Sequence, residues 1–192
     1  MKKIVLASKS PRRKEILEKF IDEFQCLDVD IDEKFDRDET PEQIVMGLSL
    51  QKALEGARKV EIDSIVIASD TIVYMDEVLC KPENYEDAFR MLKKLSGGIH
   101  SVYTGIAVVL TGTNRKFVAY NETKVKMHEL SDETIKKYID SGEVWDKAGS
   151  YGIQGKGSIL VEKIEGDFFS VMGLPISLLG KLLKEHFDIS LL

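Results

Sequence analysis

Two long aliphatic runs constrain the fold of this chain more than any other feature of its sequence. Residues 64–74 are nearly continuous in isoleucine and valine, and residues 102–110 form a second run of the same kind. An unbroken apolar strand is typical of a sheet that is covered on both faces. Between the runs, apolar residues recur at helical spacing, so the sequence predicts strands that alternate with helices, the pattern of an α/β protein.

Shorter patterns continue this alternation on both sides of the two runs. Strands are predicted at residues 3–7 and 116–127, and residues 159–164 and 168–171 are predicted to form a hairpin around Glu165-Gly166-Asp167. Helices are predicted from residues that are typical of helix starts: Ser10 with Pro11, Thr40 in a capping box with Gln43, Asn84, Ser131, and Pro175. Because hairpins place antiparallel strands side by side, the predicted sheet is mixed.

Composition and charge narrow the class of protein further. The 192 residues are 43% hydrophobic and 31% charged, which suits one buried core and predicts a single domain over residues 1–192. The sequence has no apolar run long enough for a bilayer, and its apolar start stops at Ser8, too early for a signal peptide. A formal net charge of −6 disfavours stable binding to nucleic acid. Cys26 and Cys80 favour a reduced, cytoplasmic setting, with both as packing residues.

A basic turn, Ser8-Lys9-Ser10-Pro11-Arg12-Arg13, lies between the first predicted strand and the first predicted helix. Helix N-termini present unpaired N–H donors and a partial positive charge, so anions bind there. Arg12 and Arg13 oppose that partial charge unless an anion completes the site. With the hydroxyls of Ser8 and Ser10, the turn is predicted to bind a polyphosphate. The alternative is a solvated basic turn with an ordinary serine cap.

Asp70 is an unexpected residue within the first aliphatic run. An ionised carboxylate is costly beside buried aliphatic side chains unless a partner compensates it. A position at the strand end, facing a cleft, would resolve this, and there Asp70 would bind a divalent cation, act as a base toward water, or do both. The alternative is a carboxylate that caps a neighbouring loop. Glu33 is a second candidate metal ligand, unless the acidic run 28–39 is a solvated loop.

Two lysines and a glycine-rich segment complete the set of candidates. Lys52 lies on the helix that Thr40 begins, and Lys81 follows the turn at residues 75–77; each is a stronger candidate if the fold brings it to Asp70. In the segment 146–155, glycines allow the backbone to approach a ligand closely. Gln154 offers both a donor and an acceptor, which suits the edge of a base. The segment matches neither a Walker A loop nor a Rossmann fingerprint.

Together these motifs resemble the Maf family of nucleotide pyrophosphatases along essentially the whole chain. The resemblance is carried by ordered blocks: Leu6-Ala7-Ser8-Lys9-Ser10-Pro11-Arg12-Arg13, Ser69-Asp70-Thr71, Lys81-Pro82, Asp146-Lys147-Ala148-Gly149-Ser150-Tyr151-Gly152-Ile153-Gln154-Gly155, and Gly166-Asp167 with Gly173-Leu174-Pro175. Ser69 stands where the family usually has alanine, but the departures from the family pattern remove no polar group that the chemistry requires.

The resemblance implies an elongated mixed sheet with flanking helices that forks into two lobes around a nucleotide cleft, similar to ITPase-like folds, and often a homodimer. It implies hydrolysis of a nucleoside triphosphate between the α- and β-phosphates with a divalent cation, Mg²⁺ or Mn²⁺. The chain looks like the branch that acts on dTTP and UTP, and modified pyrimidine nucleotides are further candidates. A sibling branch that prefers methylated guanine nucleotides differs at Thr71 and around residues 151–154.

The same resemblance assigns roles to the candidate residues. Asp70 is implied as the proton acceptor, and Arg12, Thr71 and Gln154 are implied as specificity positions. Glu33 stays a candidate metal ligand on the basis of the acidic run alone. The residues expected to bind the phosphates share a hydroxyl or a positive charge: Ser8, Arg12, Arg13, Lys52 and Lys81.

Two other functions remain open at the level of sequence. The family is associated with arrest of septum formation, so the chain is alternatively a non-catalytic regulator that binds nucleotide or nucleic acid. The acidic net charge and the intact Asp70, Lys52 and Lys81 disfavour that alternative. A nucleotidyltransferase would also contact triphosphates through a basic turn, but the sequence shows no acceptor site for it. The sequence does not choose between nucleotide sanitation and control of septation as the physiological role.

Overall fold

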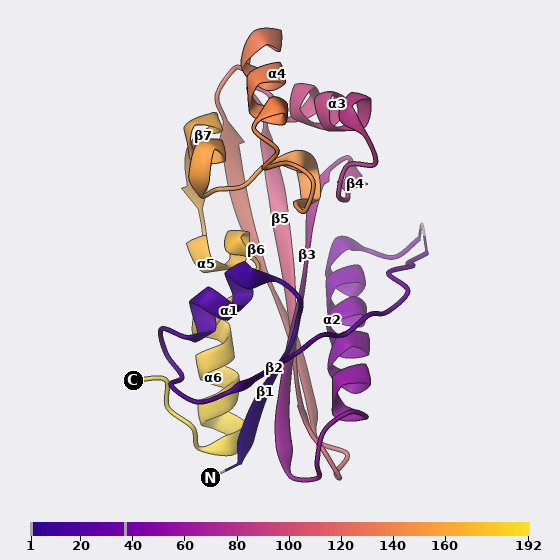
Figure 1. The fold of residues 1–192 in the computed structure, drawn as a ribbon, viewed down its shortest axis with the longest axis vertical. Helices are drawn as coiled ribbons and strands as arrows, with labels where there is room; N and C mark the ends of the chain where they lie inside the picture. Colours follow the sequence, from indigo (N-terminus) through magenta and orange to yellow (C-terminus); the bar gives the residue numbers. More distant parts are fainter. Residues whose placement is uncertain (1, 37) are drawn as a thin grey trace. The chain divides into compact units, whose positions relative to one another are not determined.

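The computed structural model describes residues 2–36 and 38–192, and the chain divides into two compact units. Unit 1 comprises Met1–Asp70, Thr104–Asn121 and Gly173–Leu192, and unit 2 comprises Thr71–Tyr103 and Glu122–Met172. The long strands β3 (Ser64–Met75), β5 (Ile99–Leu110) and β6 (Lys116–Met127) each contribute residues to both units (Figure 1). The predicted single domain and the predicted cleft therefore stay predictions.

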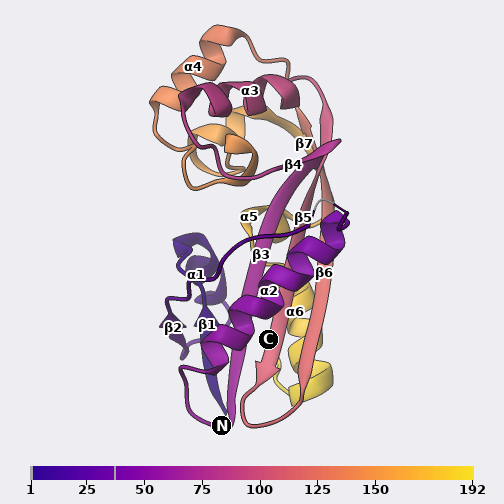
Figure 2. The ribbon, with the colours of Figure 1, turned by 90° about the vertical axis from the view of Figure 1, so that its right-hand side faces the viewer.

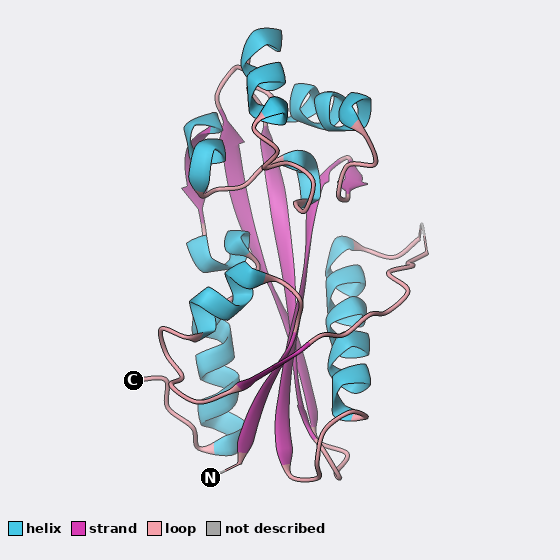
Figure 3. Cartoon of the chain, in the orientation of Figure 1, coloured by secondary structure: helices cyan, strands magenta, loops and turns pink. Residues whose placement is uncertain are grey.

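The strands pair in one mixed sheet, which confirms the predicted α/β class. Within the described part of the chain the order is β2-β1-β3-β5-β6-β7, and β4 pairs with β3 (Figure 3, magenta). β1 (Lys3–Ala7) is parallel to both β2 (Gln25–Leu27) and β3. β4 (Glu77–Leu79) is antiparallel to β3, and β7 (Val161–Glu165) is antiparallel to β6.

Helices cover both faces of the strands in unit 1. Figures 1 and 2 show α2 (Pro41–Ala57) and α6 (Ile176–Phe187) on opposite faces. Alternate residues of β1 and β3 therefore face different helices. The residues packed with Ala53 of α2 are small: Val5, Ala7, Val66 and Ala68. The intervening residues are larger and equally buried: Ile4, Leu6, Ile65 and Ile67. Burial on both faces explains why the aliphatic runs are unbroken.

The start of α2 is fixed by the predicted capping box. Thr40 Oγ1 accepts a hydrogen bond from Gln43 N at 3.4 Å, and Gln43 Oε1 accepts one from Thr40 N at 2.9 Å. A cap of this kind stabilises a helix by about 1 kcal/mol. Further along the same helix the backbone lies against Gly105 of β5, where a Cβ atom would be only 2.1 Å from Val45 O. The helix and the strand thus approach as closely as glycine permits, and this contact sets the position of α2 on the sheet.

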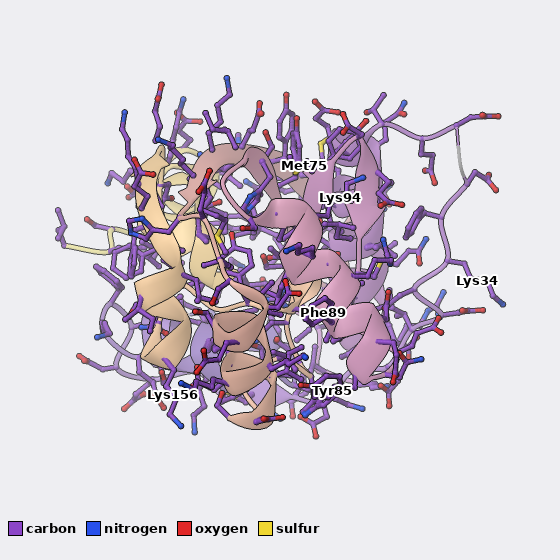
Figure 4. All side chains as sticks on the ribbon, turned by 90° about the horizontal axis from the view of Figure 1, so that it is seen from above. Lys34, Met75, Tyr85, Phe89, Lys94 and Lys156 are labelled. Atoms are coloured by element: carbon purple, nitrogen blue, oxygen red, sulfur yellow. The ribbon has the colours of Figure 1, made fainter. Side chains whose placement is uncertain are left out.

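Unit 2 has its own core, built around two helices. α3 (Tyr85–Leu95) begins at Asn84 and α4 (Asp132–Asp140) at Ser131, and each cap residue accepts a backbone hydrogen bond as predicted. Figure 4 shows Tyr85 and Phe89 on α3, and both pack partly buried against this core. Its fully buried members come from α3, α4 and the strands, including Leu92, Leu95, Ile135, Ile139, Val125 and Met127.

The predicted hairpin at residues 159–164 and 168–171 is wrong in its second half. Residues Gly155–Leu160 form a 3₁₀ helix, β7 follows, and Phe168–Met172 form the short helix α5. Asp167 explains the change, because its carboxylate accepts a hydrogen bond from Phe169 N at 2.9 Å and its carbonyl accepts one from Val171 N at 3.3 Å. These bonds close a helical turn, so the apolar residues after Asp167 do not continue as a strand.

The prediction that both cysteines are packing residues is also wrong. Cys26, in β2, and Cys80, just after β4, are both exposed thiols and are not joined by a disulfide.

None of the described helices is long and apolar enough to be a candidate membrane span.

Candidate functional site

The basic turn after β1 is organised around the Ser8 hydroxyl. Ser8 Oγ accepts hydrogen bonds from Ser10 N at 3.2 Å and from Arg13 Nη1 at 3.4 Å. Ser10 occupies the N-cap position of α1 (Pro11–Leu17), but its side chain makes no cap hydrogen bond, so the predicted serine cap is wrong. Pro11 at the first helical position is confirmed. The turn therefore depends on Ser8, which binds the backbone of residue 10 and the side chain of Arg13.

Arg13 is anchored to the C-terminal part of unit 1. Its Nε donates to the Gly173 carbonyl at 2.8 Å, and the same carbonyl accepts a hydrogen bond from Ser69 Oγ at 2.8 Å. Burial lowers the pKa of Arg13, whereas the negative charge of Asp70 raises it. Arg12 is half-buried beside Arg13, and its like charge also lowers the pKa of Arg13. Arg13 thus lies within electrostatic reach of both Arg12 and Asp70.

Asp70 lies within β3 rather than at the end of a strand, which corrects that part of the prediction. The strand continues to Met75, and Asp70 is 6% exposed. An ion pair with Lys52 of α2 compensates the buried carboxylate through its Oδ1 atom. The side chain of Lys52 is itself only 11% exposed. The ion pair with Lys52, and not a position at a strand end, therefore offsets the cost of burying this carboxylate among aliphatic side chains.

Glu33 completes this cluster. Its Oε1 lies 2.7 Å from Lys52 Nζ, so the ammonium of Lys52 contacts two carboxylates, one nearly buried and one 47% exposed. The residues that the structure brings together in unit 1 are therefore Ser8, Arg12, Arg13, Glu33, Lys52 and Asp70. The acidic run around Glu33 is more than a solvated loop, since at this point it binds the helix α2.

The two carboxylates also fit a divalent cation that arrives with a phosphorylated ligand. No group of three or more His, Cys, Asp or Glu side chains among residues 2–36 and 38–192 could hold a metal ion. However, Asp70 and Glu33 already direct oxygens at one shared cation, the ammonium of Lys52. Mg²⁺ sites in nucleotide enzymes commonly use one or two carboxylates together with phosphate oxygens. The donor set fits that chemistry and offers hard oxygen ligands alone.

The remaining candidates belong to unit 2. Thr71 follows Asp70 in β3 and is half-buried, while Lys81 is exposed in the loop after β4. Gln154 is exposed immediately before Gly155, whose φ of +67° is in the left-handed region. Gly149 N donates to the Cys80 carbonyl at 3.0 Å, so the glycine-rich segment is bound to the chain next to Lys81.

Further polar contacts of the glycine-rich segment are made by Tyr138, Glu143 and His100, residues that the sequence did not single out. Tyr138 Oη accepts a hydrogen bond from Gly152 N at 3.1 Å, and the Glu143 carboxylate accepts one from Lys156 N at 3.1 Å. His100 Nε2 lies 2.6 Å from Tyr151 Oη. Burial lowers the pKa of His100 to about 4 and raises the pKa of Tyr151, so both are neutral near pH 7. Only Tyr151 had a signal in the sequence, its place within the glycine-rich motif.

Comparisons with known proteins agree on one family. A family model described as Maf-like protein matches residues 3–186. The dTTP/UTP pyrophosphatase of Caldanaerobacter subterraneus subsp. tengcongensis is 53% identical over 188 residues, which cover 97% of this chain and 90% of the relative. The dTTP/UTP pyrophosphatase of a Thermoanaerobacter species is 50% identical over 191 residues, which cover 99% of this chain and 100% of the relative.

A solved structure gives an independent comparison of the fold. The nucleoside-triphosphatase, or dITP/XTP pyrophosphatase, from Mycobacterium abscessus matches with a TM-score of 0.50 and 17% identity. The match covers 97% of this chain and 100% of that chain. At this identity the similarity concerns the fold alone.

Proposed function

Because this chain belongs to the family of Maf-like proteins, we propose that it is a nucleoside triphosphate pyrophosphatase that hydrolyses dTTP and UTP to the monophosphate and pyrophosphate. The observation that carries the proposal is the cluster in unit 1, in which a nearly buried aspartate pairs with a lysine and lies within electrostatic reach of an arginine. Phosphoryl transfer needs positioned positive charge and a group that orients water, and this cluster contains both. The names of the two bacterial relatives support the choice of pyrimidine substrates.

Positive side chains and the Ser8 hydroxyl are proposed to bind the triphosphate. Arg13 is held by the Gly173 carbonyl at Nε and by Ser8 at Nη1, which leaves the guanidinium in a fixed orientation. A preorganised arginine loses less conformational entropy when it binds a phosphate than a freely rotating one does. Arg12, Lys52 and Lys81 are proposed to neutralise the negative charge of the β,γ-phosphates as these become the leaving group.

Asp70 is proposed to accept the proton of the attacking water. The water oxygen forms a bond to the α-phosphorus, the bond from that phosphorus to the α,β-bridging oxygen breaks, and pyrophosphate leaves with the electron pair. The proton of the water passes to the Asp70 carboxylate. Asp70 and Glu33 would hold a Mg²⁺ or Mn²⁺ ion, which when bound supplies charge neutralisation to the phosphate oxygens. We also propose a homodimer in the cytoplasm, as the family resemblance implies; light scattering tests the dimer.

The choice of bond gives the first prediction. Hydrolysis of dTTP in ¹⁸O-labelled water is expected to place the label in dTMP and none in pyrophosphate, because water attacks the α-phosphorus. Phosphorus NMR of the products measures both. The α,β-methylene analogue of dTTP is expected to resist cleavage, whereas the β,γ-methylene analogue is cleaved. Orthophosphate as the first product, or label in pyrophosphate, would contradict the proposal.

Base selection gives a second prediction. Gln154→Ala is expected to lower kcat/KM for dTTP. The expected loss of transition-state stabilisation is about 1–3 kcal/mol, the cost of an unmade hydrogen bond to a base edge. The ratio of kcat/KM for dTTP and UTP to kcat/KM for CTP and GTP should also become smaller. Gln25→Ala, which removes another exposed glutamine, in β2, is the matched control and should change neither quantity. An unaltered order of preference in Gln154→Ala would show that Gln154 does not contact the base.

A further inference from the structure

Lys52 occupies an unusual place for a residue expected to bind phosphate. Its ammonium is bound by Asp70 Oδ1 and lies 2.7 Å from Glu33 Oε1. These two carboxylates are also the ones that fit a divalent cation. Lys52 therefore stands where the oxygens of both side chains converge, with a side chain that is 11% exposed.

A divalent cation and the ammonium of Lys52 compete for these oxygens. Two positive groups placed within a few ångströms repel each other, and the repulsion is strong where burial reduces screening by water. Asp70 is 6% exposed, so water screens its surroundings poorly. A cation that binds both carboxylates must therefore displace the lysine head group. The four-carbon stem of lysine is flexible enough to allow this movement without moving the helix.

We propose that Lys52 is a built-in substitute for the metal ion: it neutralises Asp70 and Glu33 in the nucleotide-free protein and transfers to phosphate oxygens when a cation enters with the nucleotide. The inference rests on the proposed function, because it assumes that a metal-bound triphosphate is the ligand. The consequence is a coupling between two ligands. The nucleotide-free protein binds the metal weakly, and the triphosphate, by attracting Lys52, raises the affinity for the metal.

Metal binding without nucleotide tests the proposal directly. Mn²⁺ is titrated into the wild-type protein and into Lys52→Met, and electron paramagnetic resonance measures the Mn²⁺ that stays free. Methionine keeps an unbranched stem of similar length to the four-carbon stem of lysine and lacks the charged head group. Lys52→Met is expected to bind Mn²⁺ at least about tenfold more tightly than wild type, because the competing cation is gone. Lys52→Arg keeps the positive charge and should show no such gain.

Lys59→Met is the matched control for net charge. Lys59 makes an exposed ion pair with Glu55 at 3.2 Å, and its removal changes the net charge by the same amount. It is expected to leave the affinity for Mn²⁺ within about twofold, since exposed pairs are well screened. A tightening in Lys59→Met equal to that in Lys52→Met would overturn the proposal, because the effect would then be one of overall charge.

Thermal unfolding gives a second readout that does not depend on activity. Nucleotide-free Lys52→Met should have a lower Tm than wild type, since Glu33 and Asp70 lose their shared cation, and Mn²⁺ should raise that Tm more than it raises the wild-type value. If Lys52→Met does not fold, Lys52→Gln is used in both measurements. Equal Mn²⁺ affinity in the wild type and the neutral variant overturns the proposal.

The role proposed for Lys52 and the proposed function can be rejected independently. If wild type hydrolyses dTTP to dTMP and pyrophosphate but the neutral variant gains no Mn²⁺ affinity, Lys52 is not a substitute for the metal and the proposed function stands. If the variant gains affinity while wild type does not hydrolyse dTTP, the role of Lys52 stands and the proposed function is wrong.

Discussion

Asp70→Asn is expected to lower the turnover number for dTTP by about 10²- to 10⁴-fold, the usual effect of removing a general base. The substitution keeps the shape of the side chain and its place in β3 but removes the negative charge and the basic oxygen. Affinity for dTTP should survive or increase, because Arg13 and Ser8 remain and a repulsive carboxylate is gone. Steady-state turnover and equilibrium binding of dTTP measure the two effects separately.

The control for this variant is Asp32→Asn. Asp32 is exposed and pairs with Lys34 at 2.6 Å, so its neutralisation should leave turnover unchanged. A turnover of Asp70→Asn within about threefold of wild type would reject Asp70 as the base. An unfolded Asp70→Asn protein, judged by circular dichroism, would instead show that the ion pair with Lys52 is chiefly structural.

Gly105→Ala is expected to lower the free energy of unfolding by about 3 kcal/mol or more, the upper range for overpacking. Its Cβ atom would lie 2.1 Å from the Val45 carbonyl oxygen and 2.4 Å from the Val45 carbonyl carbon. Both are backbone atoms of α2, so the strain is relieved only if the helix moves off the sheet. The expected loss is a large part of the stability of an ordinary domain, about 5–15 kcal/mol. Urea unfolding measures it.

Gly47→Ala is the matched control, because Gly47 lies on α2, the helix that Gly105 contacts. Apart from its two chain neighbours and the backbone of its own helix, a Cβ placed at Gly47 meets no atom within 4 Å. Alanine also favours a helix over glycine by about 1 kcal/mol. This variant should therefore be as stable as wild type or more so. Equal stability of Gly105→Ala and wild type would mean that α2 does not lie against β5 as described.

Elements with strong local signals could be predicted from the sequence. The capping box at Thr40 and the cap at Asn84 begin helices where expected, and the range 116–127 is a strand as predicted. The failures occur where the outcome depends on one polar contact. Asp167 binds two backbone amides, at residues 169 and 171, through its side chain and its carbonyl and turns an apolar segment into α5. Ser8 rather than Ser10 organises the turn before α1.

In the candidate site, too, the sequence predicted the residues and did not predict the contacts between them. Residue types and spacing were sufficient to identify Asp70, Lys52 and Glu33 as candidates, but not to show that they contact one another. That contact depends on how α2 packs against β3, which is a tertiary property. Similarly, the bond from Arg13 to Gly173 joins residues 160 positions apart, and no periodicity in the sequence reports it.

That long-range bond has a consequence for biosynthesis. A ribosome makes the chain from the N-terminus, so the serine and arginines of the first turn emerge long before Gly173. Until then, Arg13 Nε lacks the carbonyl that binds it in the finished protein, and Ser69 lacks one of its acceptors. Unit 1 is also incomplete without its last segment, Gly173–Leu192, which contains α6. A nascent or prematurely terminated chain can thus carry every candidate side chain and still lack an organised anion site. We expect the capacity to bind triphosphate to appear only after residues 173–192 have emerged from the ribosome.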